Sequence, residues 1–187
     1  MPAKSRYKPV PSNRNTAYTL DAETRLEVVT LIGDFYETAA RHFGFCPEVP
    51  EVRFDLRGRT AGQWRVQRGV ERLRFNELLF AATPEAHIPD TVAHEVAHSA
   101  VYRCYGPKKV RPHGREWQRV MALFGVEPRV THRTCPETLA RVLDQHLYRC
   151  ACRSHALGPR QHRHVRKGQR HYLCRACGER LVWVPES

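Results

Sequence analysis

Residues 94–98 read His-Glu-Val-Ala-His, and this motif constrains the chain more than any other segment. Residues four apart on a helix lie one turn from each other on the same face, so His94 and His98 can bind one zinc ion from the same side. Glu95, between them, can reach a water on that zinc and take its proton. The motif therefore predicts a helix that carries the centre of a zinc-dependent peptidase.

A catalytic zinc takes three protein ligands and leaves a position for water, so the motif needs a third ligand. We expect it to be His113, because Gly106 and Pro112 mark a loop that could bring it back to the metal, and Gly114 allows close approach of the backbone. The competing candidates are Glu116, His132 and His87. The alternative without a metal is a buried helix, which the charge of Glu95 would make costly.

The expected chemistry follows from these residue types. Zinc lowers the pKa of a bound water from about 15.7 toward about 7 and polarises a peptide carbonyl. Glu95 would accept the proton of the attacking water and pass it to the leaving amine. A strand at residues 71–76 would lie at the edge of its sheet and hold the substrate extended through main-chain hydrogen bonds.

The apolar pattern predicts an α+β fold in which helices pack on a small, mainly antiparallel sheet. Apolar residues recur at helical spacing in residues 21–43, with Asp21 as N-cap and Gly44 as the stop. Residues 50–80 form short alternating runs punctuated by glycines, which are typical of antiparallel strands, with a hairpin turn at residues 67–70. Further helices are expected at residues 89–105, 114–124 and 136–146, the last two packed on the sheet side or against the first helix.

Two close cysteine pairs lie near the C-terminus, Cys150 with Cys152 and Cys174 with Cys177. The chain has seven cysteines, and an odd number in a reducing compartment favours metal binding over disulfides. The second pair has the knuckle spacing of a zinc ribbon, so we expect four thiolates to hold a structural zinc ion. The first pair is shorter than usual, so His155 is an alternative ligand in place of Cys150. Free or redox-active thiols are the alternative without a metal.

The chain is strongly basic, with 31 Lys and Arg against 19 Asp and Glu and a formal net charge of +12. A small protein this basic commonly meets nucleic acid, although a solvated basic surface without a specific partner is the alternative. Tyr148, Tyr172 and Trp183 could stack on unpaired bases or form the core of the ribbon. The residues expected to contact DNA lie on the arms of the ribbon: Arg160, Arg163, Arg166, Lys167 and Arg170.

We predict three parts: a flexible lead-in at residues 1–20, a metalloprotease domain at residues 21–146 and a basic zinc-ribbon module at residues 147–187. No apolar run approaches the ~20 residues of a membrane span, and the N-terminus lacks the apolar stretch of a signal peptide. We therefore expect a cytoplasmic monomer without a membrane partner. Cys46 and Cys104 are expected to be small core residues, and no role is assigned to them or to Cys135.

Several motifs form a specific combination: HEVAH at 94–98, HGREW at 113–117, THRT at 131–134 and the cysteine segments YRCAC and RHYLCRACG. Together with RGRTAGQWRV and ERLRFNELLF upstream, they resemble the SprT-like family, which includes the eukaryotic Spartan proteases. The resemblance implies a zincin-like minimal metalloprotease domain followed by a zinc ribbon, with His94, His98 and His113 as metal ligands and Glu95 as the catalytic residue. Spartan-type members degrade proteins crosslinked to DNA and are stimulated by DNA, which implies a similar substrate class here and, for a bacterial chain, a place at the nucleoid.

The leading prediction is a zinc-dependent endopeptidase that acts on DNA-associated proteins, including proteins crosslinked to DNA, and that holds one catalytic and one structural zinc ion. The alternative is a non-proteolytic, zinc-containing DNA-binding or regulatory protein. The intact Glu95 argues against it, because a structural zinc needs no base. A general peptidase independent of DNA is the third candidate, and the basic charge disfavours it.

Overall fold

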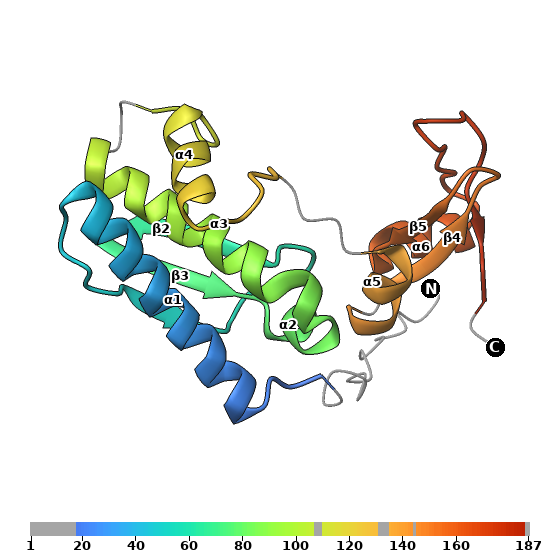
Figure 1. Cartoon of the computed structure of the whole chain (residues 1–187). Helices are drawn as coiled ribbons and strands as arrows, with labels where there is room; N and C mark the ends of the chain where they lie inside the picture. The colour runs from blue at the N-terminus through green and yellow to red at the C-terminus, as the bar shows by residue number, and fades with distance from the viewer. Residues whose placement is uncertain (1–17, 107–109, 131–134, 144, 186–187) are drawn as a thin grey trace.

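The computed structural model describes residues 18–106, 110–130, 135–143 and 145–185. Figure 1 shows a mixed α+β structure with two small sheets, one beside the long helices and one near the C-terminus. The predicted α+β class is confirmed. Most of the predicted lead-in, and the THRT segment with His132, lie outside the described residues.

Helix α1, Ala22–Phe43, begins and ends where its sequence predicts. The side chain of Asp21 caps its first turn by accepting a hydrogen bond from the Thr24 N–H at 2.7 Å. Gly44 ends it with a φ of 76°, a left-handed conformation that glycine adopts at little cost. The buried face of α1 carries Val28, Ile32, Tyr36, Ala39 and Ala40.

The first sheet contains β1 (Glu51–Arg53), β2 (Gly62–Gln67) and β3 (Val70–Phe75) in the order β1-β3-β2. Strands β2 and β3 form the predicted hairpin, whose two turn residues, Arg68 and Gly69, have φ values of 51° and 77°. Two positive φ values are typical of the tight turns whose twist suits a hairpin. The prediction of a turn at residues 67–70 is confirmed.

The sheet is mainly antiparallel, as expected, because β2 pairs with β3 in the antiparallel sense over six residue pairs and β1 pairs with β3 in parallel over three. One expectation about this sheet is wrong. Strand β3 lies between the other two, so the expected edge strand at residues 71–76 is central. The cause is the connection after β1, which passes round the end of β3, where the Leu56 N–H donates to the Phe75 carbonyl and the Asn76 N–H to the Ala61 carbonyl. Strand β2 is therefore an edge strand of the described sheet.

Helix α3 (Pro84–Tyr105) is the central element of this part of the chain and follows the short helix α2 (Glu77–Ala82). It begins five residues before the expected start at Pro89, which lies inside the helix. Pro89 cannot donate the helical hydrogen bond, but the first turns also bury His87 and Ile88, which are 2% and 4% exposed. The stabilisation gained by burying these turns therefore exceeds the cost of the hydrogen bond that Pro89 cannot make, and the helix continues through the proline.

Helices α1 and α3 pack side by side and share one core with the first sheet (Figure 1). Val28, Ile32 and Tyr36 of α1 meet Leu73 and Phe75 of β3 and the apolar side chains of α3: Ile88, Val92 and Val96. Helix α4 (Arg115–Leu123), which was predicted at residues 114–124, closes the other side of α3 through Trp117, Val120 and Met121. This packing leaves the middle of α3 buried on most of its surface.

Helix α5 (Pro136–Val142) ends four residues before the predicted end, and strand β4 starts at His146. It packs against α2, β4 and β5 rather than on the first sheet or on α1, as Figure 1 also shows. Leu79 of α2, Leu139 of α5 and Ala156 of β5 form the small apolar cluster at this contact. The predicted domain boundary at residues 146 and 147 stays a prediction.

The second sheet contains β4 (His146–Arg149), β5 (Ser154–Leu157) and β6 (Val182–Trp183) in the antiparallel order β5-β4-β6. Residues 159–166, which were expected on a ribbon arm, form helix α6 (Pro159–Arg166), with a proline in its first turn. The core here is small and consists of Tyr148, Leu157, Cys174 and Leu181. None of the helices in the described ranges has the length and apolar character of a membrane span.

Candidate metal centres and active site

The first candidate centre lies in the middle of α3. His94 and His98 are one turn apart, and their Nε2 atoms are 3.2 Å from each other. His94 is 7% exposed, and His98 is half-buried. The motif therefore presents two imidazole nitrogens together, as the helical period predicts.

His113 reaches the same point from the loop between α3 and α4. Its Nε2 lies 3.0 Å from that of His94 and 3.1 Å from that of His98. The residue has a φ of 59°, which is uncommon outside glycine and re-aims the chain into α4. A Cβ on Gly114 would lie 3.0 Å from the Arg111 carbonyl oxygen, so the tight turn beside His113 favours glycine.

Trp117 supports all three imidazoles, and no role was predicted for it. It is 1% exposed, its indole N–H donates to the His94 carbonyl at 3.3 Å, and its ring centroid lies 4.8 Å from those of His94 and His113. The signal was present in the sequence, because Trp117 lies one helical turn after His113 in the HGREW motif.

This donor set fits a zinc ion. With Zn–N bonds of about 2.0–2.1 Å, two nitrogens in tetrahedral coordination lie roughly 3.3 Å apart, close to the spacing of the three Nε2 atoms. Burial, together with the charge of His113, lowers the pKa of His98 to about 4, and burial lowers the pKa of His113. Both rings therefore favour the neutral form, which is the form that binds metals.

Two of the three competing third ligands, His87 and Glu116, lie in the described part of the chain and outside this group. His87 is buried against Phe80 and is not in this group of imidazoles. Glu116 lies on α4 beside Gly114 and is also outside the group. The ligand set that the described residues bring together is thus His94, His98 and His113.

Glu95 follows His94 on α3, is buried, and is held by the edge strand. It is 7% exposed, and its Oε2 accepts a hydrogen bond from the main-chain N–H of Trp64 in β2 at 2.5 Å. Burial raises the pKa of Glu95 to about 7, against the effect of the Trp64 N–H. A carboxyl group with this pKa can accept and release a proton near neutral pH.

Gly62 and Trp64 of β2, for which the sequence suggested no role in the site, position this strand against α3. A Cβ on Gly62 would lie 2.5 Å from the Thr91 Cγ2 and 2.8 Å from the Glu95 Cγ, so only glycine lets the strand come this close. The side chain of Trp64 is fixed by Glu71, whose carboxylate accepts from the Trp64 indole at 2.9 Å and from Ser99 and Arg103 at 2.6 Å and 2.9 Å.

The raised pKa of Glu95 predicts how the stability of the metal-free protein depends on pH. The folded-state pKa of about 7 exceeds the reference value of 4.5, so the stabilisation from the neutral form is complete below pH 4.5 and is lost as the pH rises to 7. The loss is about 3 kcal/mol. The free energy of unfolding of chelator-treated protein can be measured in urea at pH 4.5 and at pH 7.5. Between these two pH values, the stability of Glu95→Gln should rise relative to that of the original chain.

Glu37→Gln, at an exposed position of α1, is the control for the same chemical change. His98, whose pKa is lowered, acts in the opposite direction below pH 6.5, and it is common to all three proteins. A Glu95→Gln difference that did not change between the two pH values would contradict the assignment.

The second candidate centre consists of four cysteines. The Sγ atoms of Cys150 and Cys152 are 3.5 Å apart, those of Cys152 and Cys174 are 3.7 Å apart, and all four, with Cys177, lie within 4.8 Å of one another. Zn–S bonds of about 2.3 Å place two tetrahedral sulfurs roughly 3.8 Å apart, so this set also fits zinc. The N–H groups of Cys177 and Ala176 lower the pKa of the Cys174 thiol.

His155, the alternative fourth ligand, has its Nε2 at 3.3 Å from the Cys150 Sγ. It can therefore hydrogen bond to that sulfur, while the four cysteines supply the compact set. Among the other cysteines, Cys46 is exposed and Cys104 is half-buried, and neither is among the buried core residues, so the expectation that both are core residues is wrong. Cys46 lies between α1 and the first sheet, where the chain has left the core.

The predicted DNA-contacting residues are all exposed: Arg160, Arg163, Arg166, Lys167 and Arg170. Arg166 lies over the ring of Trp183 at 4.8 Å. Tyr148 is fully buried and bonds through its hydroxyl to His162, so it is not available for stacking on bases. Tyr172 and Trp183 are partly buried against the same core.

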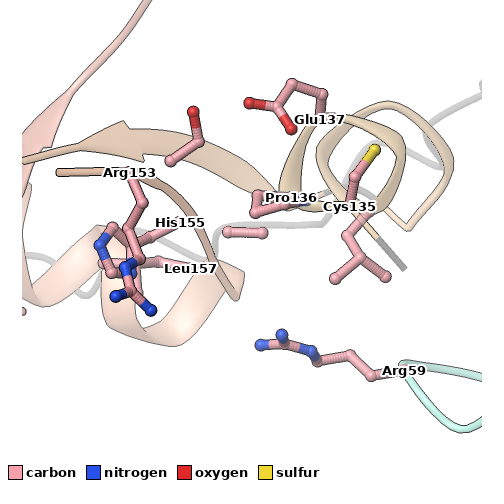
Figure 2. A pocket seen from close by; sticks show the side chains of 10 residues that line it. Arg59, Cys135, Pro136, Glu137, Arg153, His155 and Leu157 are labelled. Carbon is pink, nitrogen blue, oxygen red and sulfur yellow. The ribbon is translucent and has the colours of Figure 1, made fainter. Parts of the chain in front are cut away.

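Two cavities lie near these centres. One, of about 730 Å³, separates the loop before β2 from α5 and β5. Figure 2 shows Arg59 on one side of it and Arg153, His155 and Glu137 on the other. The second, of about 140 Å³, adjoins His98 and His113.

Comparison with known proteins places the chain among relatives that align with most of its length. The sequence profile of the SprT-like family matches residues 32–137, which contain the three histidines and Glu95. Protein SprT of Shewanella oneidensis is 37% identical over 157 residues, which cover 83% of this chain and 97% of that protein. Protein SprT of Vibrio parahaemolyticus is 32% identical over 87% of this chain and 95% of its own length, and that of Pseudomonas aeruginosa 39% over 73% and 82%.

The matched segment runs from α1 to the start of α5, and the longer alignments extend over most of the chain. The family match covers more than half of the chain, and the relatives are aligned over most of their own length. This chain belongs to the SprT-like family.

Proposed function

We propose that the protein is a zinc-dependent endopeptidase that acts on proteins bound to DNA, including proteins crosslinked to it. The observation that carries the proposal is the convergence of three imidazole nitrogens within 3.0–3.2 Å beside a buried glutamate. A binding module would need the metal ligands and would have no need of Glu95. The zincin-like arrangement of the SprT-like domain is part of this proposal.

His94, His98 and His113 would hold the catalytic zinc, which when bound polarises the scissile carbonyl and acidifies a water. Glu95 accepts the proton of the attacking water and delivers it to the leaving amine. In the metal-free chain, burial raises the pKa of Glu95, which favours uptake of a proton by this carboxylate. The Trp64 N–H holds one carboxylate oxygen and so aims the other.

Strand β2 takes the role that was first expected of β3. Its outer edge faces α3, because the Trp64 N–H points at Glu95 rather than at β3. The Trp64 N–H is taken by Glu95, so an extended peptide that adds to this edge would use other main-chain groups of β2. The scissile bond would then lie between the edge strand and the imidazoles.

The four cysteines would hold a second, structural zinc that stabilises the small C-terminal sheet. The exposed basic residues on and after α6 would contact the phosphates of DNA. This surface and the net charge of +12 support DNA-bound proteins as the substrate class.

The test is cleavage of a basic DNA-binding protein by the zinc-loaded chain, with and without single-stranded DNA. We expect cleavage that DNA accelerates and that a chelator stops. The triple change Arg160→Ala, Arg163→Ala and Arg170→Ala should remove most of the acceleration and keep the basal rate. Cleavage that is indifferent to DNA would favour a general peptidase, and zinc binding without any cleavage would favour the binding protein.

Gly62→Ala should damage this site without touching a ligand. The added methyl group meets Thr91 and Glu95 at 2.5–2.9 Å, so β2 or Glu95 must move. We expect a loss of about 1–3 kcal/mol in the free energy of unfolding and a cleavage rate lower by about 10- to 100-fold. Thermal unfolding and initial rates measure the two effects.

Gly33→Ala is the matched control, because nothing lies within 4 Å of a Cβ at that position of α1. It should stabilise the helix by about 0.5–1 kcal/mol and leave cleavage unchanged. If both variants cleaved at the original rate, the close approach of β2 to Glu95 would have no part in catalysis.

A further inference from the structure

The smaller cavity, of about 140 Å³, opens beside the imidazoles rather than elsewhere on the surface. Its apolar walls come from β2, α3, the loop after α3, and α4: Trp64, Val101, Tyr102, Val110, Pro112 and Trp117. Resting on the proposed function, we propose that this cavity, which we call the side-chain pocket, receives an aromatic or large aliphatic side chain from the residue next to the cleaved bond.

The position of the side-chain pocket ties its occupant to the metal centre. His98 and His113 form part of its wall, so a group inside it lies beside two of the three nitrogens that would bind zinc. Trp64 stacks near His98, with ring centroids 6.2 Å apart and planes 20° apart, and its ring lies 5.3 Å from that of Tyr102. A peptide on the β2 edge therefore meets the pocket at Trp64.

The size and chemistry of the pocket select the side chain. A cavity of about 150 Å³ lined by apolar residues accommodates a benzene molecule, so this one suits a phenylalanine or leucine side chain. Arg111 carries the one permanent charge among the described lining residues, and it is exposed. It disfavours lysine and arginine, and a carboxylate that pairs with it is the competing occupant.

The pocket is already formed, because its two tryptophans are anchored from outside. Glu71 accepts from the Trp64 indole, and the His94 carbonyl accepts from the Trp117 indole. A preformed cavity costs little ordering when a ligand enters. Its selectivity should therefore appear in binding as well as in turnover.

The first test measures binding to the zinc-loaded full chain. Hydroxamates of phenylalanine, leucine, aspartate and glycine are titrated, with tryptophan fluorescence as the signal. The phenylalanine and leucine compounds should bind about 10- to 100-fold more tightly than the glycine compound, since they bury one more apolar side chain. Equal affinity for all four, or the tightest binding by aspartate, would overturn the proposal.

Variants of the lining residues test whether the side-chain preference arises in this pocket. Val110 is half-buried at the pocket, and Val110→Phe should fill it and remove most of the preference. Val182→Phe makes the same change on β6, where the side chain is 64% exposed, and should keep the preference. Tyr102→Ala enlarges the pocket and should shift the preference toward a naphthyl side chain. Unchanged preferences in both pocket variants would exclude this cavity.

A second test separates the pocket from the proposed function. Peptides that differ at one residue beside a single cleavable bond are offered to the same proteins. Cleavage without any dependence on that residue would overturn the pocket and leave the peptidase standing. No cleavage of any peptide, with the hydroxamate preference intact, would overturn the peptidase and leave an apolar ligand site beside the metal centre.

Discussion

Glu95→Gln should abolish cleavage and leave both metal centres loaded. Glutamine has nearly the same shape, and its carbonyl oxygen can still accept the hydrogen bond from the Trp64 N–H. It cannot take a proton from water, and general base catalysis contributes about 10²–10⁴-fold to a rate. Single-turnover cleavage should fall by at least that factor, while zinc content, measured by mass spectrometry, stays the same.

Glu116→Gln is the matched control for this variant. Glu116 lies on α4 close to His113 and outside the group of metal-binding side chains. Its replacement should change the rate by less than about threefold, a surface-type effect. Activity of Glu95→Gln within a few-fold of the original rate would remove Glu95 from the mechanism, and loss of its zinc would make it a structural residue.

Cys174→Ser should release one zinc ion per chain and unfold the part of the chain around the second sheet. Cys174 is 3% exposed and belongs to a core in which the described part of the chain buries four residues, which is too small to hold the sheet by itself. Structural zinc contributes an apparent 10–16 kcal/mol in small zinc-finger peptides. The amide protons of β4 and β5 should lose their protection from exchange, and those of α1 and α3 should retain it.

Cys46→Ser is the control, since Cys46 is exposed and lies outside the four-cysteine group. It should keep the zinc content and the exchange pattern. A Cys174→Ser protein with an intact second sheet would show that apolar packing alone stabilises that sheet. If His155 replaced a lost thiolate, a Cys150→Ser variant would keep zinc while Cys174→Ser lost it.

The parts of the site that depend on local geometry were predictable. The pairing of His94 with His98 follows from the helical period, and the caps of α1 follow from Asp21 and Gly44. His113 was harder, because its approach depends on its own left-handed backbone conformation, whereas Gly106, Pro112 and Gly114 indicated only a loop that could return to the metal. The spacing of Cys174 and Cys177 likewise indicated a knuckle.

The parts that depend on neighbours in space were not. An alternating pattern shows which residues of β3 share a face, but not which strand lies beside it, so the edge was assigned to the wrong strand. Gly62 and Trp64 are more than thirty residues from Glu95, and no local signal links them to it. Helix α6 was missed because it buries no residue, which leaves no apolar stripe to indicate a helix.

The hydrogen bond between the Trp64 N–H and Glu95 makes one backbone amide a reporter of the candidate active site. Amide protons at the outer edge of a sheet normally exchange rapidly with solvent, because no partner strand covers them. The Trp64 amide has a carboxylate partner instead. Its proton resonance and its exchange rate should follow the ionisation of Glu95, so a solution spectrum can report the protonation state of the proposed base without a substrate, an inhibitor or a mutation.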